Sequence, residues 1–193
     1  MSGSHGLPRI LDVAIAGLGL LLTGPLLVIL MVAIRFDSAG AAIYRQRRVG
    51  RDGEEFDLLK LRTMARGADP VGIGTAVPAD DPRVTRIGRP LRRFSLDELP
   101  NLVNVIRGEM AIVGPRPTIP AQVELYTDEE RRRLEVRPGI TGWAQVNGRI
   151  GIPWDERIVL DVWYVENRSL TLDLKILGRT TGLLFTGKGL DPA

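Results

Sequence analysis

Residues 10–34, ILDVAIAGLGLLLTGPLLVILMVAI, form an almost wholly apolar run in which only Asp12 and Thr23 have polar side chains. At about 1.5 Å per residue, a helix of this length crosses a hydrocarbon core of roughly 30 Å. The run is too long and too apolar for the core helix of so small a domain, and no signal-peptide cleavage site follows it. The sequence therefore predicts a helix inserted in a membrane.

The pair Gly24-Pro25 lies in the middle of this run. A proline inside a helix removes one backbone hydrogen bond and clashes with the preceding turn, at a cost of about 3 kcal/mol. In lipid the freed carbonyls need new partners, and Thr23 can supply one. Two topologies stay open: a kinked spanning helix, or a re-entrant helix broken at Gly24-Pro25. The positive-inside rule places the downstream side in the cytoplasm, because it carries Arg45, Arg47, Arg48, Arg51 and Lys60.

The composition of the 193-residue chain excludes several kinds of active site. Cysteine is absent, and the one histidine is His5, near the start of the chain. Thiol nucleophiles, Ser-His-Asp triads and histidine-ligated zinc are thereby excluded. Metal ligands must come from carboxylates or other oxygen donors, which favours a hard cation such as Mg²⁺. The formal charge of +3 favours anionic partners: membrane phosphates, nucleotide phosphates or nucleic acid.

Beyond the membrane segment, the pattern predicts a small β-hairpin and several helices. Residues 42–49 and 55–64, on either side of a turn, indicate two paired strands. Helices are predicted over residues 99–106, 154–167 and 169–185. The last is either a core helix or an amphipathic helix in the membrane interface, with Lys175, Arg179 and Lys188 toward the headgroups. The predicted fold class is α+β and mostly helical.

The stretch RRFSLDELPNL, residues 92–102, carries two adjacent carboxylates, Asp97 and Glu98, at a predicted helix start. Nearby arginines and the helix dipole favour ionised carboxylates, and the same place attracts phosphate. We expect Asp97 to attack a phosphate, although an acid at a helix start is most often only a cap. Two registers compete: Ser95 as N-cap in a capping box, or Asp97 as N-cap. The second is favoured because Pro100 then lies in the first turn.

Four cationic side chains are candidates for contacts with phosphate: Arg92, Arg116, Arg149 and Lys60. Prolines on both sides fix the backbone of Arg116, so that its fork is presented at low entropic cost. Arg149 ends a Gly-rich, aromatic segment, residues 137–149, of a kind that suits a nucleotide. Lys60 alternates with apolar residues and shares a face with Arg62. The simpler interpretation of each is a solvated surface charge or a packed turn.

Several segments together resemble the bacterial sugar transferases, the monotopic phosphoglycosyl transferases of polyprenol-linked glycan assembly. The similarity runs from about Arg9 to the last predicted helix, and five motifs in order behind an apolar segment make it specific. The matching stretches are KLRTM (60–64), DPR (81–83), SLDELP (95–100), VGPRP (113–117) and PGITG through NGR (138–149).

The resemblance implies transfer of a phosphosugar from a UDP-sugar to a polyprenol phosphate, usually undecaprenyl phosphate, with release of UMP. It implies Asp97 as the nucleophile of a covalent aspartyl-phosphosugar intermediate, and Asp97 and Glu98 at Mg²⁺. Arg92, Arg116 and Arg149 match arginines near the phosphates, and Lys60 matches a lysine near the active site. The family's membrane helix is re-entrant and broken at a Ser-Pro pair, which is Gly24-Pro25 here.

The expected protein is therefore monotopic, with a flexible N-terminus (1–8) and a re-entrant helix-break-helix (9–36). Residues 37–193 would form a cytosolic catalytic domain with interfacial C-terminal helices, on the cytoplasmic face of the bacterial inner membrane. The expected partners are a UDP-sugar, undecaprenyl phosphate and membrane lipid, without nucleic acid and with a homodimer possible. The sequence names neither the sugar nor the glycan, which is an exopolysaccharide, an O-antigen or a glycoprotein.

Two other functions stay open. The first is a membrane-anchored scaffold that binds anionic lipid or nucleic acid through its arginines. Such binding would fall steeply with salt and would be indifferent to Asp97. The second is a Mg²⁺-dependent phosphatase, which would release its product into water without a polyprenol phosphate.

Overall fold

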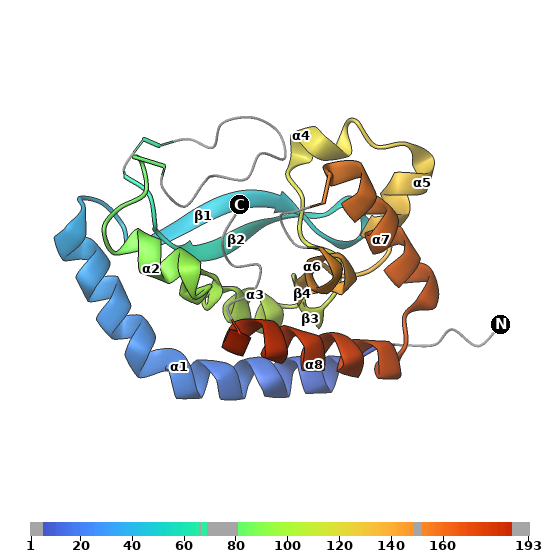
Figure 1. Cartoon of the computed structure of the whole chain (residues 1–193), viewed down its shortest axis with the longest axis horizontal. Coiled ribbons are helices and arrows are strands. Elements are labelled where there is room, and N and C mark those ends of the chain that lie inside the picture. Colours follow the sequence, from blue (N-terminus) through green and yellow to red (C-terminus); the bar gives the residue numbers. More distant parts are fainter. Residues whose placement is uncertain (1–5, 66, 69–80, 149–151, 187–193) are drawn as a thin grey trace.

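The computed structural model describes residues 6–65, 67–68, 81–148 and 152–186. A β-hairpin, a pair of short strands and several short helices pack against a long bent helix and the last helix (Figure 1). This confirms the α+β class. The elements are α1 (Arg9–Asp37), β1 (Ile43–Val49), η1 (Arg51–Gly53), β2 (Glu55–Leu61), α2 (Gly88–Arg93), η2 (Leu96–Glu98), α3 (Asn101–Arg107), β3 (Ala111–Val113), α4 (Pro120–Val123), α5 (Asp128–Arg131), η3 (Arg132–Leu134), β4 (Gly139–Thr141), α6 (Trp143–Asn147), α7 (Trp154–Asn167) and α8 (Leu170–Thr186).

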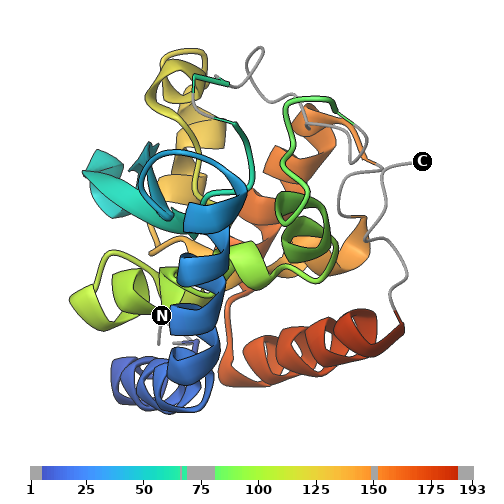
Figure 2. The same cartoon turned by 90° about the vertical axis from the view of Figure 1, so that its left-hand side faces the viewer.

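Helix α1 is, among the described residues, the one helix long and apolar enough to cross a membrane by length and composition. The helix continues through Gly24 and Pro25. Its ribbon bends near the middle in both views, without a break in the helix (Figures 1 and 2). The Thr23 hydroxyl donates to Gly19 O at 2.7 Å, rather than to Leu21 O, the carbonyl that Pro25 leaves free. A bond of this kind to the preceding turn favours bending.

Both ends of α1 are tied to the rest of the molecule. At its start, Arg9 donates to two carbonyls at the C-terminal end of α3, at 2.5 and 3.1 Å. The buried Asp12 carboxylate accepts a hydrogen bond from Ile112 N at 2.9 Å. At its end, Arg62 donates to the two backbone carbonyls that directly follow α1, each at 2.6 Å. Cations at helix C-terminal carbonyls are favourable, so these contacts fix α1 to α3 and to the hairpin.

The hairpin of β1 and β2 is antiparallel, with Tyr44 opposite Lys60, which confirms the predicted strand pair. Strand β2 is fixed to α3 by Asn104, a fully buried residue that the sequence analysis did not identify. Its amide donates to Asp57 O at 2.8 Å and to a carboxylate oxygen of Glu109 at 2.6 Å, and its oxygen accepts from Leu59 N at 3.1 Å. This network sets the position of Lys60 relative to the start of α3.

Replacing this amide should destabilise the protein. Asn104→Ala leaves the buried Leu59 N–H and two half-buried acceptors, Asp57 O and the Glu109 carboxylate, without this partner, so we expect the free energy of unfolding to fall by about 3 kcal/mol. Thermal unfolding followed by tryptophan fluorescence measures the effect. Asn167→Ala is the matched control, because that amide is exposed and donates only to Trp163 O. A Tm for Asn104→Ala equal to that of the control would contradict the role of the network.

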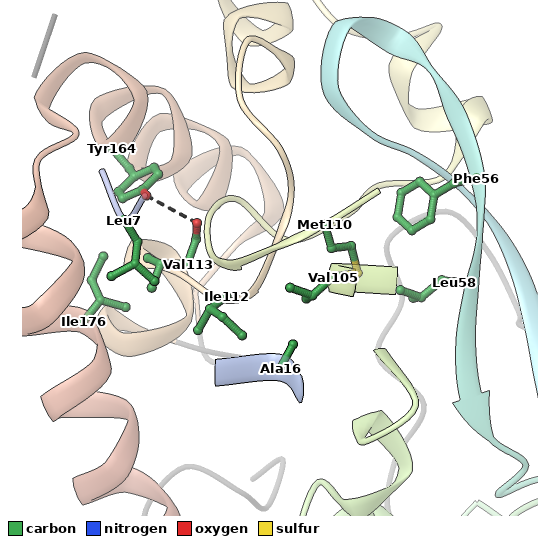
Figure 3. Close-up of a cluster of buried hydrophobic side chains, with 10 residues drawn as sticks. All are labelled: Leu7, Ala16, Phe56, Leu58, Val105, Met110, Ile112, Val113, Tyr164 and Ile176. Atoms are coloured by element: carbon green, nitrogen blue, oxygen red, sulfur yellow. Dashed lines mark hydrogen bonds between the residues drawn. The ribbon is translucent and has the colours of Figure 1, made fainter. Parts of the chain in front are cut away.

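The main core lies between β2, the α3–β3 segment and α8. Phe56 and Leu58 of β2 point toward Met110 and Val105 (Figure 3). At the other end of this core, the buried hydroxyl of Tyr164 donates to an Asp173 carboxylate oxygen at 2.7 Å. The other oxygen of that carboxylate accepts from Leu7 N at 2.6 Å. Leu7 itself is buried, although it lies in the segment 1–8 for which flexibility was predicted.

Helix α8 lies along the same side of the molecule as the first part of α1 (Figures 1 and 2). Leu170 and Leu174 of α8 are exposed, as an interfacial helix would require. Two of the basic side chains predicted to face headgroups also contact α6. Lys175 and Arg179 lie over the Trp143 ring of α6, with 5.7 and 5.2 Å to its centroid, in cation–π contacts. Lys188 lies outside the described residues.

Candidate active site

Asp97 and Glu98 lie in the short 3₁₀ turn η2 rather than at the N-terminus of an α-helix. Neither predicted register is correct, because α3 begins only at Asn101 with Pro100 before it. Pro100 has a fixed φ and no N–H, which suits the start of α3. Ser95 precedes η2 in the left-handed region, at φ 54°, and its side chain caps nothing. A non-glycine residue in this conformation is strained, and such strain concentrates at functional sites.

Three segments distant in sequence meet at Glu98. Lys60 of β2 places its Nζ 2.8 Å from Glu98 Oε1, and Arg116, from the corner after β3, places Nη2 2.6 Å from the same oxygen. The side chains of Lys60 and Glu98 are only 16% and 19% exposed. Because both side chains are largely shielded from bulk water, the electrostatic attraction between Lys60 and Glu98 is stronger than at an exposed surface. The structure thus brings together three of the predicted site residues next to Asp97.

The two carboxylates have different electrostatic environments. Burial alone would raise the pKa of Glu98, but Arg116 and Lys60 outweigh it and hold that pKa well below its ordinary range. Burial raises the pKa of Asp97 to about 6, the negative Glu98 adds to the increase, and the attraction of Lys60 and Arg116 only partly offsets it. The predicted attraction of the arginines acts on both carboxylates, but at Asp97 desolvation outweighs it and raises the pKa, which still leaves Asp97 mainly ionised at pH 7.

The ionisation of Asp97 should be measurable. In metal-free protein we expect its carboxyl carbon to titrate near pH 6 in ¹³C NMR, well above an ordinary Asp, because the charged form is desolvated. The carboxylate fraction, and with it any attack by Asp97, should rise roughly tenfold from pH 5 to pH 7. Glu98→Gln should lower the Asp97 midpoint, because it removes a neighbouring negative charge. A midpoint near pH 4 in the unchanged protein would refute this description.

The other predicted phosphate ligands have different outcomes. Arg92 lies half-buried in the last turn of α2, and its charge lowers the pKa of Asp97 through space. Arg149 lies outside the described residues, so its role stays a prediction.

Arg48 of β1 was not predicted as a site residue, yet it lines one small pocket with Glu98 and Arg116. Burial and the neighbouring Arg116 lower its pKa to about 10. In the sequence of the hairpin, nothing distinguishes Arg48 from the neighbouring arginines, so its place beside Glu98 and Arg116 could not be predicted.

The pair Asp97 and Glu98 offers Mg²⁺ two carboxylates but no third acidic ligand among the residues that the structure describes. No cluster of three or more His, Cys, Asp or Glu side chains suited to a metal occurs in the described part of the chain. Mg²⁺ is typically held by one or two carboxylates together with substrate phosphates, so a larger cluster is not required. Asp97 and the Glu98 oxygen that Lys60 and Arg116 leave free are the donors available for a shared ion.

Most of this chain is similar in sequence to known proteins. The sequence profile of a family described as bacterial sugar transferase matches residues 4–187. A UDP-glucose:undecaprenyl-phosphate glucose-1-phosphate transferase of Caulobacter vibrioides is 45% identical, over 92% of this chain and 69% of its own length. The uncharacterized sugar transferase EpsL of Bacillus subtilis is 41% identical, over 95% of this chain and 90% of its own length.

A third relative is much longer. The undecaprenyl-phosphate galactose phosphotransferase of Salmonella typhimurium is 36% identical over 96% of this chain, which spans 42% of that protein. The similarity in all three extends over more than nine tenths of this chain, which includes α1, the Asp97-Glu98 turn and the segment around Arg116. With the profile match over most of its length, the chain belongs to the bacterial sugar transferase family.

Proposed function

We propose that this protein is a phosphoglycosyl transferase that moves a phosphosugar from a UDP-sugar to undecaprenyl phosphate. The observation that carries the proposal is the desolvated Asp97 beside Glu98, which Lys60 and Arg116 hold. The substrates in the names of the Caulobacter and Salmonella relatives support this reaction class. The glycan would be an exopolysaccharide, an O-antigen or a glycoprotein glycan, whose membrane assembly this step begins.

In the first half-reaction, an Asp97 carboxylate oxygen attacks the phosphorus that carries the sugar. An Asp–phosphorus bond forms, the bond from that phosphorus to the bridging oxygen breaks, and UMP leaves with the bonding electrons. Burial makes Asp97 a more basic carboxylate than an exposed Asp, because its charged form is poorly solvated. Arg116 and Lys60 stabilise the charge that develops on the phosphate oxygens.

In the second half-reaction, a phosphate oxygen of undecaprenyl phosphate attacks the same phosphorus. A diphosphate bond forms, the Asp97–phosphorus bond breaks, and its electrons return to Asp97, which leaves as the free carboxylate. No histidine base is needed, because the attacking phosphate is already an anion. Two successive displacements at phosphorus, with Asp97 carrying the phosphosugar between them, predict ping-pong kinetics.

Mg²⁺, held by Asp97 and Glu98 together with the diphosphate, would supply charge neutralisation when bound. Glu98 keeps its negative charge and orients Lys60 and Arg116 toward the reacting phosphate. Arg92 and Arg149 are proposed as further phosphate contacts.

For α1 we propose a re-entrant topology, in which both ends lie at the cytoplasmic face of the bacterial inner membrane. The bend in α1 supports it, as do the contacts of Arg9 and Arg62, which tie the two ends to one body. A straight helix of this length would carry its ends about 40 Å apart. The exposed apolar side chains of α1 and α8 would then face lipid, and the Asp97 site would meet a lipid phosphate at the membrane surface.

The test is release of UMP by the full chain in lipid nanodiscs. UDP-glucose and UDP-galactose are offered separately with Mg²⁺, with and without undecaprenyl phosphate. We expect catalytic UMP release with one of them only when the lipid phosphate is present. A binding scaffold would release none, and a phosphatase would turn over without the lipid.

A further inference from the structure

The corner that carries Arg116 is held at every one of its carbonyls. Pro115 and Pro117 have no N–H groups, so half of the corner's backbone donors are missing and its carbonyl oxygens carry more of the anchoring. Each carbonyl of residues 115–118 accepts a hydrogen bond. The donors, in the order of their acceptors, are Gly139 N (2.8 Å), Arg133 Nη2 (3.0 Å), Arg48 Nη1 (3.0 Å) and Val49 N (2.8 Å).

Arg133 is unlike the other three donors, because it is a fully buried cation. It forms an ion pair with Asp161 of α7 at 2.5 Å, and both side chains are 2% exposed. Its guanidinium also donates to the hydroxyl of Tyr126 and lies over the rings of Tyr126 and Trp154. Among the described residues, Arg133 forms no hydrogen bond or ion pair with Glu98 or Asp97, and its link to the site is the hydrogen bond to the carbonyl of Arg116.

Burying such a pair is costly. The cost of removing two charges from water offsets most of the attraction between them. Proteins in which apolar side chains of similar volume replace such a pair are often as stable or more stable. What apolar side chains cannot do is donate a hydrogen bond to the carbonyl of Arg116. The geometry therefore suggests a role in placing Arg116 rather than in stability alone.

We propose that the buried Arg133–Asp161 pair positions Arg116, and through it the cation that binds the donor's phosphate. This rests on the proposed transferase function. A displacement of a phosphate-binding group by about 1 Å costs up to roughly 100-fold in rate. Loss of the pair should therefore lower kcat/KM for the UDP-sugar by roughly 10- to 100-fold, and part of that loss should be a higher KM.

The decisive variant is Arg133→Met/Asp161→Leu, which replaces both charges with apolar side chains. We expect a Tm close to that of the unchanged protein, a KM raised about tenfold and a lower kcat/KM. Tyr164→Phe is the matched control: it loses buried hydrogen bonds on the same helix but does not touch the corner. Its KM should stay unchanged. If the double variant does not fold, Arg133→Lys keeps the charge beside Asp161 and should show the same rise in KM.

A double-mutant cycle with Arg116→Ala separates this inference from the proposed function. If Arg133 acts through Arg116, removing the pair in the Arg116→Ala background should change kcat/KM by less than about twofold. A full additional loss there, or an unchanged KM in the folded pair variant, would overturn the positioning role. If Arg116→Ala itself leaves turnover unchanged, the proposed role of Arg116 in the transferase reaction fails instead.

Discussion

Asp97→Asn should abolish turnover. The amide is the same size as the carboxylate but cannot form the acyl phosphate, so we expect UMP release to fall by roughly 10⁴-fold or more, as for other lost nucleophiles. The fold should survive, because Asp97 makes no hydrogen bond within the described residues and its burial disfavours the charge. UMP release is measured with the UDP-sugar that the unchanged protein uses.

The control for this variant is Asp128→Asn, which removes a carboxylate from the exposed first turn of α5, remote in sequence from the site. It should retain full activity. Turnover by Asp97→Asn at more than about a tenth of the normal rate would refute Asp97 as nucleophile.

Gly139→Ala should prevent stable folding. A Cβ at this position would lie 2.1 Å from Gly114 N and 2.4 Å from Thr141 O, and both of these are backbone atoms that cannot move aside cheaply. The parallel pair β3–β4 would have to separate, with loss of the bonds from Gly139 N to Pro115 O and from Gly114 N to Thr141 O. We expect the free energy of unfolding to fall by more than about 4 kcal/mol.

At this chain length, such a loss lowers the Tm by about 10 °C or leaves no folded protein. The control is Gly178→Ala in α8, where an added Cβ meets nothing within 4 Å. That change should be neutral or stabilise the protein by up to about 1 kcal/mol, because alanine favours a helix. Equal Tm values for the two variants would contradict the close approach of the β3 and β4 backbones at Gly114 and Gly139.

Elements with a local pattern could be predicted from the sequence. The helix predicted over residues 154–167 is α7, with the same bounds, because its apolar spacing repeats over four turns. The strands predicted around a Gly-rich turn are β1 and β2. Segment 137–149 gave no such signal, since β4 is three residues long and exists only through its pairing with β3. A strand so short has no period of its own to detect.

The site was predictable as residue types and less so as geometry. The charges around Asp97 suggested an ionised acid, but its raised pKa follows from burial, which depends on the packed chain. Glu98 is held by Lys60, which is distant in sequence. Helix-capping rules consider only neighbouring residues, so they could not predict this contact. Arg48 and Arg133 look like ordinary surface arginines in the sequence, and only the contacts with the Arg116 corner give them a role.

The most direct test of the central claim is mass spectrometry of the protein after incubation with its UDP-sugar and Mg²⁺ in the absence of polyprenol phosphate. We predict one phosphosugar added per chain, located by peptide mapping on Asp97 and discharged when undecaprenyl phosphate is supplied. An unmodified protein that still transfers phosphosugar when the lipid is present, or an adduct on another residue, would contradict the account.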